Sequence, residues 1–149
     1  MTFEPTAQQQ RLLNFAAGSK AGVLVTLKRD GRPQLSNISY HYDPQRYLVR
    51  VSVTADRAKT ANAVRDPRVS LHVTSSDFWT WAVLDGTARL TAIATDPHDE
   101  AVAELIDLYR AINGEHPDWD DYRAAMVADR RQVLSIDVTH AYGQPPPEK

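Results

Sequence analysis

The 149-residue sequence contains no cysteine, so it forms no disulfide, carries no thiolate nucleophile and offers zinc no cysteine ligand. It also lacks a large excess of charge of either sign, because it contains 17 lysine and arginine residues and 19 acidic residues. Such a balance creates no basic field for nucleic acid or for an acidic membrane. No apolar run is long enough to cross a bilayer, and the opening residues MTFEPTAQQQ lack the pattern of a signal peptide. We therefore expect a cytoplasmic protein with neither a nucleic-acid nor a membrane partner.

The short motifs of several enzyme classes are absent as well. The five histidines have no zinc-like spacing, and the sequence has no HExxH, G-x-S-x-G, GxGxxG or Walker loop. The acidic group Asp118, Asp120 and Asp121 is typical of a charged helix start. We therefore predict no metal site and no catalytic side chain. If the protein is an enzyme, a bound cofactor supplies the reaction chemistry.

The hydrophobic pattern predicts a mainly β protein. Asp30-Gly31 separates two strand-like runs as a hairpin turn does, and Asp85-Gly86 interrupts a long run and indicates a bend or bulge. The run 46–53 alternates as a half-buried strand does. We expect one domain over residues 1–149, an antiparallel β-barrel with peripheral α-helices. Its predicted strands are 21–28, 34–42, 46–53, 68–75, 78–93 and 132–139, and its predicted helices are 6–18, 57–66, 98–113 and 118–130.

The stretch Arg57-Ala-Lys-Thr60 places two cations and a hydroxyl in the first turn of a helix. We expect Asp56 to cap this helix and Ala58, Ala61 and Val64 to face inward. Cations are unfavourable there, because the amino end of a helix carries partial positive charge. A bound phosphate would remove the conflict, since free N–H groups, arginine, lysine and threonine all donate to phosphate oxygens. The motif is short, and ordinary solvated cations on a surface helix are the alternative.

A wider arrangement of residues resembles the flavin/deazaflavin oxidoreductases of the split β-barrel type, the superfamily of the pyridoxamine 5'-phosphate oxidases. The resemblance rests on Gly22-Val-Leu, Thr26-Leu-Lys-Arg-Asp-Gly-Arg-Pro-Gln-Leu-Ser-Asn37, Val51-Ser-Val53, Arg57-Ala-Lys-Thr60, Asn62 and Arg65-Asp-Pro-Arg68. It is closer to the actinobacterial branch that uses coenzyme F420. That likeness rests on Trp79, Trp119-Asp-Asp-Tyr-Arg123, Ala125-Met and Asp129-Arg-Arg131. The resemblance covers the chain from about Gly22 to Gly143.

This resemblance implies a six-stranded antiparallel split β-barrel of the FMN-binding type, in a homodimer with a cofactor at the subunit interface. Trp79 would approach that cofactor from the partner subunit. The phosphate would be held by Arg57, Ala58, Lys59 and Thr60, and the ring and ribityl chain would be lined by Gln34, Leu35, Ser36, Asn37, Val51 and Ser52. Each assignment has a rival: Leu35 and Val51 can be core residues, Asn37 can pair with backbone, and Trp79 can be only a dimer contact.

The resemblance also implies an activity. It is a reductase in which reduced coenzyme F420 passes a hydride from C5 to a small electron-poor acceptor, such as an enone, a quinone or a tetrapyrrole-like compound. FMN ends at its phosphate, whereas coenzyme F420 continues through a lactyl group into a polyglutamate tail. Cations available for that tail are Lys28, Arg50, Arg123 and Arg130. An FMN-dependent oxidoreductase and a non-catalytic carrier of F420 or flavin are the alternatives, and Tyr40, Tyr42, Lys28 or solvent could supply the proton.

Overall fold

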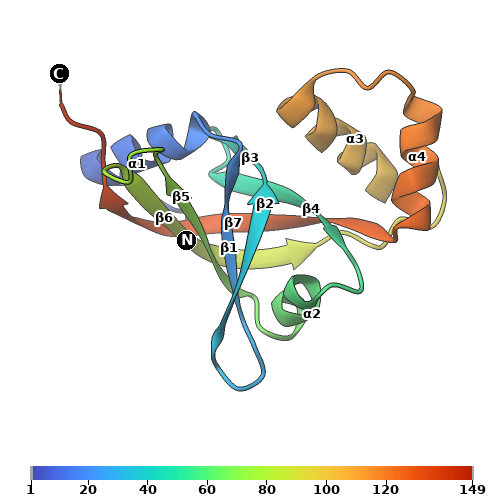
Figure 1. Cartoon of the computed structure of the whole chain (residues 1–149), viewed down its shortest axis with the longest axis horizontal. Coiled ribbons are helices and arrows are strands. Elements are labelled where there is room, and N and C mark those ends of the chain that lie inside the picture. The colour runs from blue at the N-terminus through green and yellow to red at the C-terminus, as the bar shows by residue number, and fades with distance from the viewer. Residues whose placement is uncertain (1, 149) are drawn as a thin grey trace.

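The structure is a computed structural model that describes residues 2–148. One curled antiparallel sheet is accompanied by four helices (Figure 1). The helices are α1 (Ala7–Ala17), α2 (Ala58–Arg65), α3 (Glu100–Asn113) and α4 (Trp119–Ala128). The strands are β1 (Ala21–Leu27), β2 (Pro33–Ser39), β3 (His41–Asp43), β4 (Leu48–Thr54), β5 (Arg68–Thr74), β6 (Trp81–Leu90) and β7 (Arg131–Gln144). Among residues 2–148, no helix is both long and apolar enough to span a membrane.

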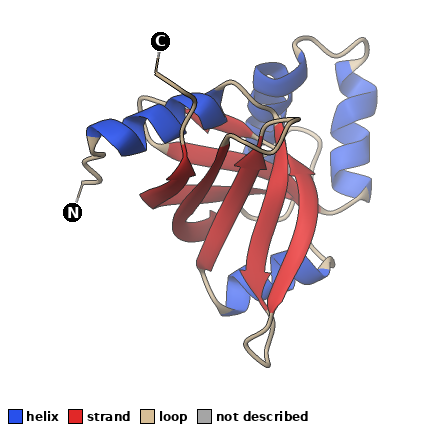
Figure 2. Cartoon of the chain, turned by 60° about the vertical axis from the view of Figure 1, so that its left-hand side comes forward, coloured by secondary structure: helices blue, strands red, loops and turns tan. Residues whose placement is uncertain are grey.

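The sheet has seven strands in the order β2-β1-β5-β6-β7-β4-β3, so the predicted number of six is wrong. The difference arises at Tyr40, where the predicted strand 34–42 is divided into β2, which pairs with β1, and β3, which pairs with β4. The two edge strands are therefore consecutive in the sequence, although they lie at opposite ends of the sheet. This connection requires a strongly curled sheet, as Figure 2 shows, and it is consistent with a split barrel.

Two hydrophobic cores lie on opposite sides of the sheet. The first fills the curl and is closed at one end by Leu12, Leu13 and Ala16 of α1. The second lies between α3, α4 and the start of β7. Because α3 also contacts the outer side of β4, Arg50 is only 9% exposed, and the prediction of a half-buried strand at 46–53 is wrong. On one face Val49, Val51 and Val53 belong to the first core, and on the other face Arg50 is covered by α3.

Local signals at chain turns and ends agree with the structure. Thr6 and Gln9 form a capping box at the start of α1, as their spacing indicates. The ladder between β6 and β7 shifts register at Asp85/Gly86, which confirms the predicted bulge. A Cβ on Gly86 would lie 2.3 Å from the Asp137 carbonyl oxygen, so glycine permits the strands to approach closely there. Residues 78–80 form part of a loop rather than the start of the strand.

Helix α2 differs from its prediction in both its cap and its inward face. The N-cap is Arg57, which makes no side-chain cap bond, and Asp56 lies before it. The buried residues are Thr60, Asn62 and Ala63, whereas Val64 is 69% exposed. Polar bonds to neighbouring strands hold this face. Asn62 Nδ2 donates to Thr26 Oγ1 of β1 over 3.2 Å, and Thr60 Oγ1 donates to the Thr54 carbonyl over 2.8 Å.

We expect Tyr40→Phe to lower the free energy of unfolding by about 1 kcal/mol, the usual net value of a buried hydrogen bond. The Tyr40 hydroxyl is buried and donates to the Ala16 carbonyl over 2.6 Å, which ties α1 to the β2–β3 junction. Burial raises the pKa of Tyr40 to about 12, so the donor stays protonated at neutral pH. Urea unfolding measures the change. The half-exposed Tyr142→Phe is the control, and an equal loss in both variants would contradict the role of this bond.

Candidate functional site

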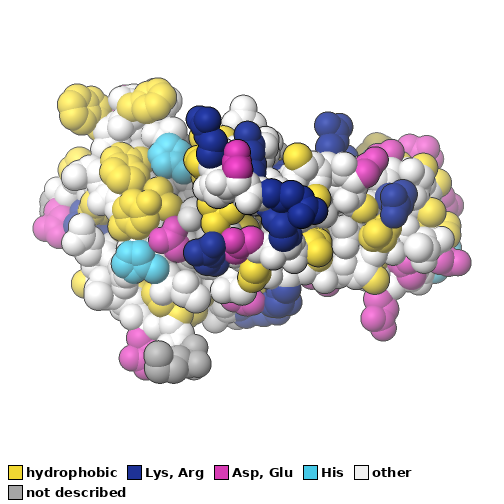
Figure 3. All heavy atoms as spheres, turned by 90° about the horizontal axis from the view of Figure 1, so that it is seen from below, with side chains coloured by type: hydrophobic (Ala, Val, Ile, Leu, Met, Phe, Trp, Pro, Cys, Tyr) yellow, Lys and Arg dark blue, Asp and Glu magenta, His cyan; other side chains and the backbone are white. Residues whose placement is uncertain are grey.

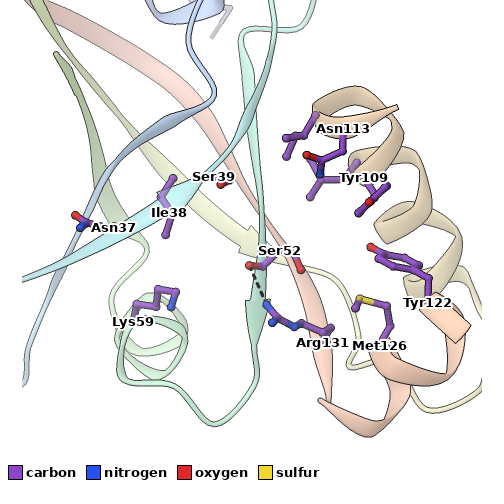
Figure 4. Close-up of a pocket in the computed structure, with 12 residues that line it drawn as sticks. Asn37, Ile38, Ser39, Ser52, Lys59, Tyr109, Asn113, Tyr122, Met126 and Arg131 are labelled. Atoms are coloured by element: carbon purple, nitrogen blue, oxygen red, sulfur yellow. Dashed lines mark hydrogen bonds between the residues drawn. The ribbon is translucent and has the colours of Figure 1, made fainter. Parts of the chain in front are cut away.

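A cleft of about 370 Å³ lies between the sheet and the helix pair α3–α4 (Figure 4). Its wall on one side is β2, β4 and the start of α2, and its wall on the other is largely apolar and aromatic. Among the described residues, the lining includes lysine and arginine but no aspartate, glutamate or histidine. The lining residues are Asn37, Ile38, Ser39, Ser52, Lys59, Leu108, Tyr109, Ile112, Asn113, Tyr122, Met126 and Arg131.

The cationic end of the cleft is at the amino terminus of α2. Lys59 lies in the first turn of this helix, which contains no acidic residue, next to the N-cap Arg57. Burial lowers the pKa of Lys59, and the positive charges of Arg57 and Arg131 lower it further. Three cations therefore act on one another where a helix also presents free N–H groups. This arrangement favours an anionic ligand.

Arg131 is the charged residue of the cleft lining that was not predicted as a site residue from the sequence. It is the first residue of β7 and pairs with Thr54, so it enters the cleft beside β4. Its Nη1 lies 3.5 Å from the Ser52 carbonyl oxygen, a long hydrogen bond, and its Nε is buried without a hydrogen-bond partner among the described residues. Arg131 reaches the cleft through the pairing of β4 with β7, and no local sequence pattern indicates that pairing.

Three of the predicted cofactor residues line the cleft together. Asn37 of β2, Ser52 of β4 and Lys59 of α2 come from separate segments and meet at this surface. Arg57 and Ala58 lie just outside the lining, exposed at the start of α2. Thr60 is buried, and its hydroxyl donates to the Thr54 carbonyl. The hydroxyl proton of Thr60 is therefore not available to a ligand.

The other predicted cofactor residues lie outside the lining. Val51 is 1% exposed and its side chain belongs to the core of the barrel. Gln34, Leu35 and Ser36 continue along β2 beyond Asn37, with Leu35 largely exposed. Trp79 is 79% exposed in the loop between β5 and β6 and does not line the cleft of its own chain.

The loop that carries Trp79 is held in shape by its own polar groups. The Asp77 carboxylate accepts from the Ser75 hydroxyl over 2.6 Å and from the Trp79 N–H over 3.0 Å. Phe78, between them, has a φ of 68° and is also exposed. Figure 3 shows hydrophobic side chains gathered toward one end of the molecule, away from the lysines and arginines nearer its middle. The loop backbone is thus held by hydrogen bonds, and two aromatic side chains are exposed on it.

The wall formed by α3 and α4 is an aromatic cluster fixed to the sheet. Tyr109 lies 5.1 Å from Tyr122 and 5.7 Å from Trp119, between ring centroids. Arg50 of β4 donates to Asp107 of α3 over 2.8 Å, so this arginine is engaged in an ion pair. Of the other cations considered for an acidic tail, Arg123 donates to the Pro97 carbonyl. None of Lys28, Arg50, Arg123 and Arg130 lines the cleft.

A metal site is not indicated by side-chain geometry. Within residues 2–148, no group of three or more histidine, cysteine or acidic side chains could hold a metal ion. The chemical character of the cleft is instead that of an anion site beside an apolar wall, with hydroxyl and amide groups from Ser39, Ser52 and Asn37 between them.

Comparisons with known proteins agree with the fold described above. The family model described as "Pyridoxamine 5'-phosphate oxidase" matches residues 8–144. An F420 reductase of known structure is 22% identical with a TM-score of 0.65, over 93% of this chain and 98% of that one. A candidate pyridoxamine 5'-phosphate oxidase from Listeria innocua is 15% identical with a TM-score of 0.66, over 91% and 97%. A heme-binding protein from Mycobacterium smegmatis is 19% identical with a TM-score of 0.64, over 95% and 55%. At such identities the structural likeness shows the fold alone.

We expect Asp107→Asn to lower the free energy of unfolding by about 1–2 kcal/mol, because it leaves the nearly buried Arg50 without its charged partner. The loss is smaller than for a fully buried pair, since Asp107 is mostly exposed. Glu115→Gln is the matched control. It neutralises an exposed ion pair between Arg110 of α3 and the α3–α4 loop, keeps an oxygen that can accept from Trp119 Nε1, and should cost below about 0.5 kcal/mol. Equal effects in urea unfolding would show that Arg50–Asp107 does not hold the wall of the cleft.

Proposed function

The chain belongs to the pyridoxamine 5'-phosphate oxidase family, and we propose that within this family it is a coenzyme F420-dependent reductase. The family binds flavin-type cofactors, and its members are commonly dimeric. When bound, reduced coenzyme F420 supplies a hydride from C5 for a small electron-poor acceptor, such as an enone, a quinone or a tetrapyrrole-like compound. The tasks left to the protein are to hold the cofactor, to orient the acceptor and to exclude water.

The observation that carries the proposal is the convergence of Lys59, Arg131 and Ser52 at the start of α2. A lysine of lowered pKa and the free N–H groups of the helix start form a donor set that suits a phosphate. Arg131 lies beside them, and its Nε has no hydrogen-bond partner among the described residues. This fit supports a phosphate-bearing cofactor in the cleft. It applies equally to FMN, so the choice of coenzyme F420 rests on the resemblance of the sequence and on the experiment below.

In the proposed site, the helix start binds phosphate and the strands bind the ring. Lys59 and Arg57 donate to phosphate oxygens, and Ala58 and Thr60 contribute backbone N–H groups. Ser52 and Asn37 face the ring and ribityl chain from two strands. Val51 takes part through its backbone, because its side chain is in the core. The remaining proposed contacts, further along β2, are Gln34, Leu35 and Ser36.

No side chain is proposed as a catalytic residue. Tyr40 and Tyr42 are both buried in the core of the barrel, and burial raises the pKa of each to about 12. Neither lines the cleft, and neither does Lys28. We therefore propose that the proton that accompanies the hydride comes from solvent.

The proposed assembly is a homodimer in which each cleft is completed by the partner. Trp79 and Phe78 are large apolar side chains in an exposed loop held by hydrogen bonds. Burial of two aromatic side chains is a substantial contribution to association. In this assembly the partner's Trp79 covers the cofactor, which accounts for its absence from the cleft of its own chain.

The proposal is tested first by fluorescence titration of the protein with coenzyme F420 and, at the same ionic strength, with FMN. We expect tighter binding of coenzyme F420, followed by hydride transfer to at least one member of a panel of enones, quinones and tetrapyrroles. Lys59→Ala should weaken binding of either phosphate-bearing cofactor by about 1.5–3 kcal/mol, the usual net value of a charged hydrogen bond. Lys28→Ala removes the same charge from the exposed β1–β2 hairpin and should change little.

The other outcomes of that titration would indicate a different function for this protein. Tighter binding of FMN would identify a flavin-dependent oxidoreductase. Tight binding of coenzyme F420 without transfer to any acceptor would identify a carrier. An unchanged cofactor affinity in Lys59→Ala would contradict the proposal that the phosphate binds at the start of α2.

A subunit-mixing experiment tests the shared site. In a heterodimer of a Lys59→Ala chain and a Trp79→Ala chain, one site has both wild-type residues and the other site has neither. We expect tight coenzyme F420 binding to reappear in the mixture at one site per heterodimer, although each variant alone binds weakly. Native mass spectrometry of a tagged chain counts the heterodimers. Heterodimers that recover no tight site would show that Trp79 does not complete the partner's cleft, and a monomer in sedimentation would rule out the dimer.

A further inference from the structure

Arg131 is a cation without adequate compensation in the free protein. Its side chain is 31% exposed, and its Nε is buried without a hydrogen-bond partner among residues 2–148. The carboxylate of Asp129 lies 3.9 Å from Nε and is itself half exposed, so this ion pair is weak. Buried donors in folded proteins are normally satisfied. Arg131 also lines the cleft, so a ligand bound there can supply an acceptor to its guanidinium group.

The position of Arg131 relative to the α2 end of the cleft indicates which part of a ligand it meets. Figure 4 shows its side chain pointing from β7 toward Ser52, with Lys59 on one side and Met126 on the other. A group held by Lys59 and the start of α2 therefore has Arg131 next to it, in the direction of the α3–α4 wall. Arg131 can therefore contact the part of the ligand that extends from that group into the rest of the cleft.

The charge available at this end exceeds what a terminal phosphate needs. Arg57, Lys59 and the partial charge of the helix terminus together supply about +2.5, against a charge of about -1.5 to -2 on a phosphate monoester. Arg131 adds one more positive charge. A phosphodiester carries less charge than a monoester, so additional cations suit a ligand with further anionic groups attached to it. The planar fork of arginine fits a carboxylate with two parallel hydrogen bonds.

We propose that Arg131 is a specificity-determining residue that binds a carboxylate attached beyond the phosphate, so that the cleft selects a phosphodiester with an acidic extension over a ligand that ends at a phosphate monoester. This inference rests on the proposed function for the identity of the cofactor. It replaces the cations that the sequence offered for the acidic tail, since Lys28, Arg50, Arg123 and Arg130 do not line the cleft.

The test compares two ligands on three variants by fluorescence titration at one ionic strength. In Arg131→Gln, coenzyme F420 should bind at least about tenfold more weakly, whereas FMN should lose less than about threefold. Arg131→Lys keeps the charge without the fork and should fall between Arg131→Gln and the wild type. Arg130→Gln is the matched control, because it removes the same charge from the neighbouring exposed residue. Losses of the same size for both ligands, or none for either, would overturn the proposal.

A second measurement does not depend on the deazaflavin. Inorganic phosphate and 2-phospholactate, which adds one carboxylate, are compared as stabilisers against thermal unfolding. The wild type should be protected more by 2-phospholactate, and Arg131→Gln should abolish the difference between the two anions. Equal protection of the wild type would overturn the role of Arg131 even if a variant fails to fold. If coenzyme F420 itself binds no better than FMN while 2-phospholactate still depends on Arg131, the proposed cofactor is wrong and the carboxylate site is right.

Discussion

The one-residue connection at Tyr40 is the constraint on which the rest of the structure depends. Strands β2 and β3 are separated only by this residue, yet they are opposite edges of the sheet. The sheet must therefore curl until its edges approach each other, and the buried Tyr40 is fixed in that junction by its N–H, which donates to the Lys20 carbonyl, and by its hydroxyl. The same curl brings β2, β4 and the start of β7 to one surface, which is where Asn37, Ser52 and Arg131 meet.

The features that could be predicted from the sequence are those with local causes. The capping box at Thr6 and the bulge at Asp85/Gly86 each depend on residues a few positions apart, and both are found where the sequence indicates. Lys59, which lines the cleft, could be singled out from the sequence because its conflict with the helix terminus is also local. Arg131 could not, because it enters the site through the pairing of β4 with β7, and its contact with Ser52 joins residues 79 positions apart.

Helix α2 shows why an apolar pattern can mislead in a short helix. Eight residues give just over two turns, so the inward face predicted from Ala58, Ala61 and Val64 carries little hydrophobic area. The actual face is decided by polar groups. Asn62 donates to Thr26, and Arg65 donates to Asn62 Oδ1 over 3.1 Å and to the Leu27 carbonyl. This network fixes α2 against β1 and so sets the direction in which Lys59 faces, a result of tertiary hydrogen bonding that the hydrophobic pattern does not contain.

The cationic end of the cleft has an electrostatic cost that a bound anion would offset. Burial and two neighbouring positive charges lower the pKa of Lys59, which means that the fold works against its charge. An anion bound there would offset that repulsion, and because it binds the folded chain alone it would also stabilise the fold. The effect is local, since the protein as a whole has a net charge of -2. A mildly acidic protein can in this way present a local site for a phosphorylated anion, because the curled sheet brings cations of α2 and β7 close together.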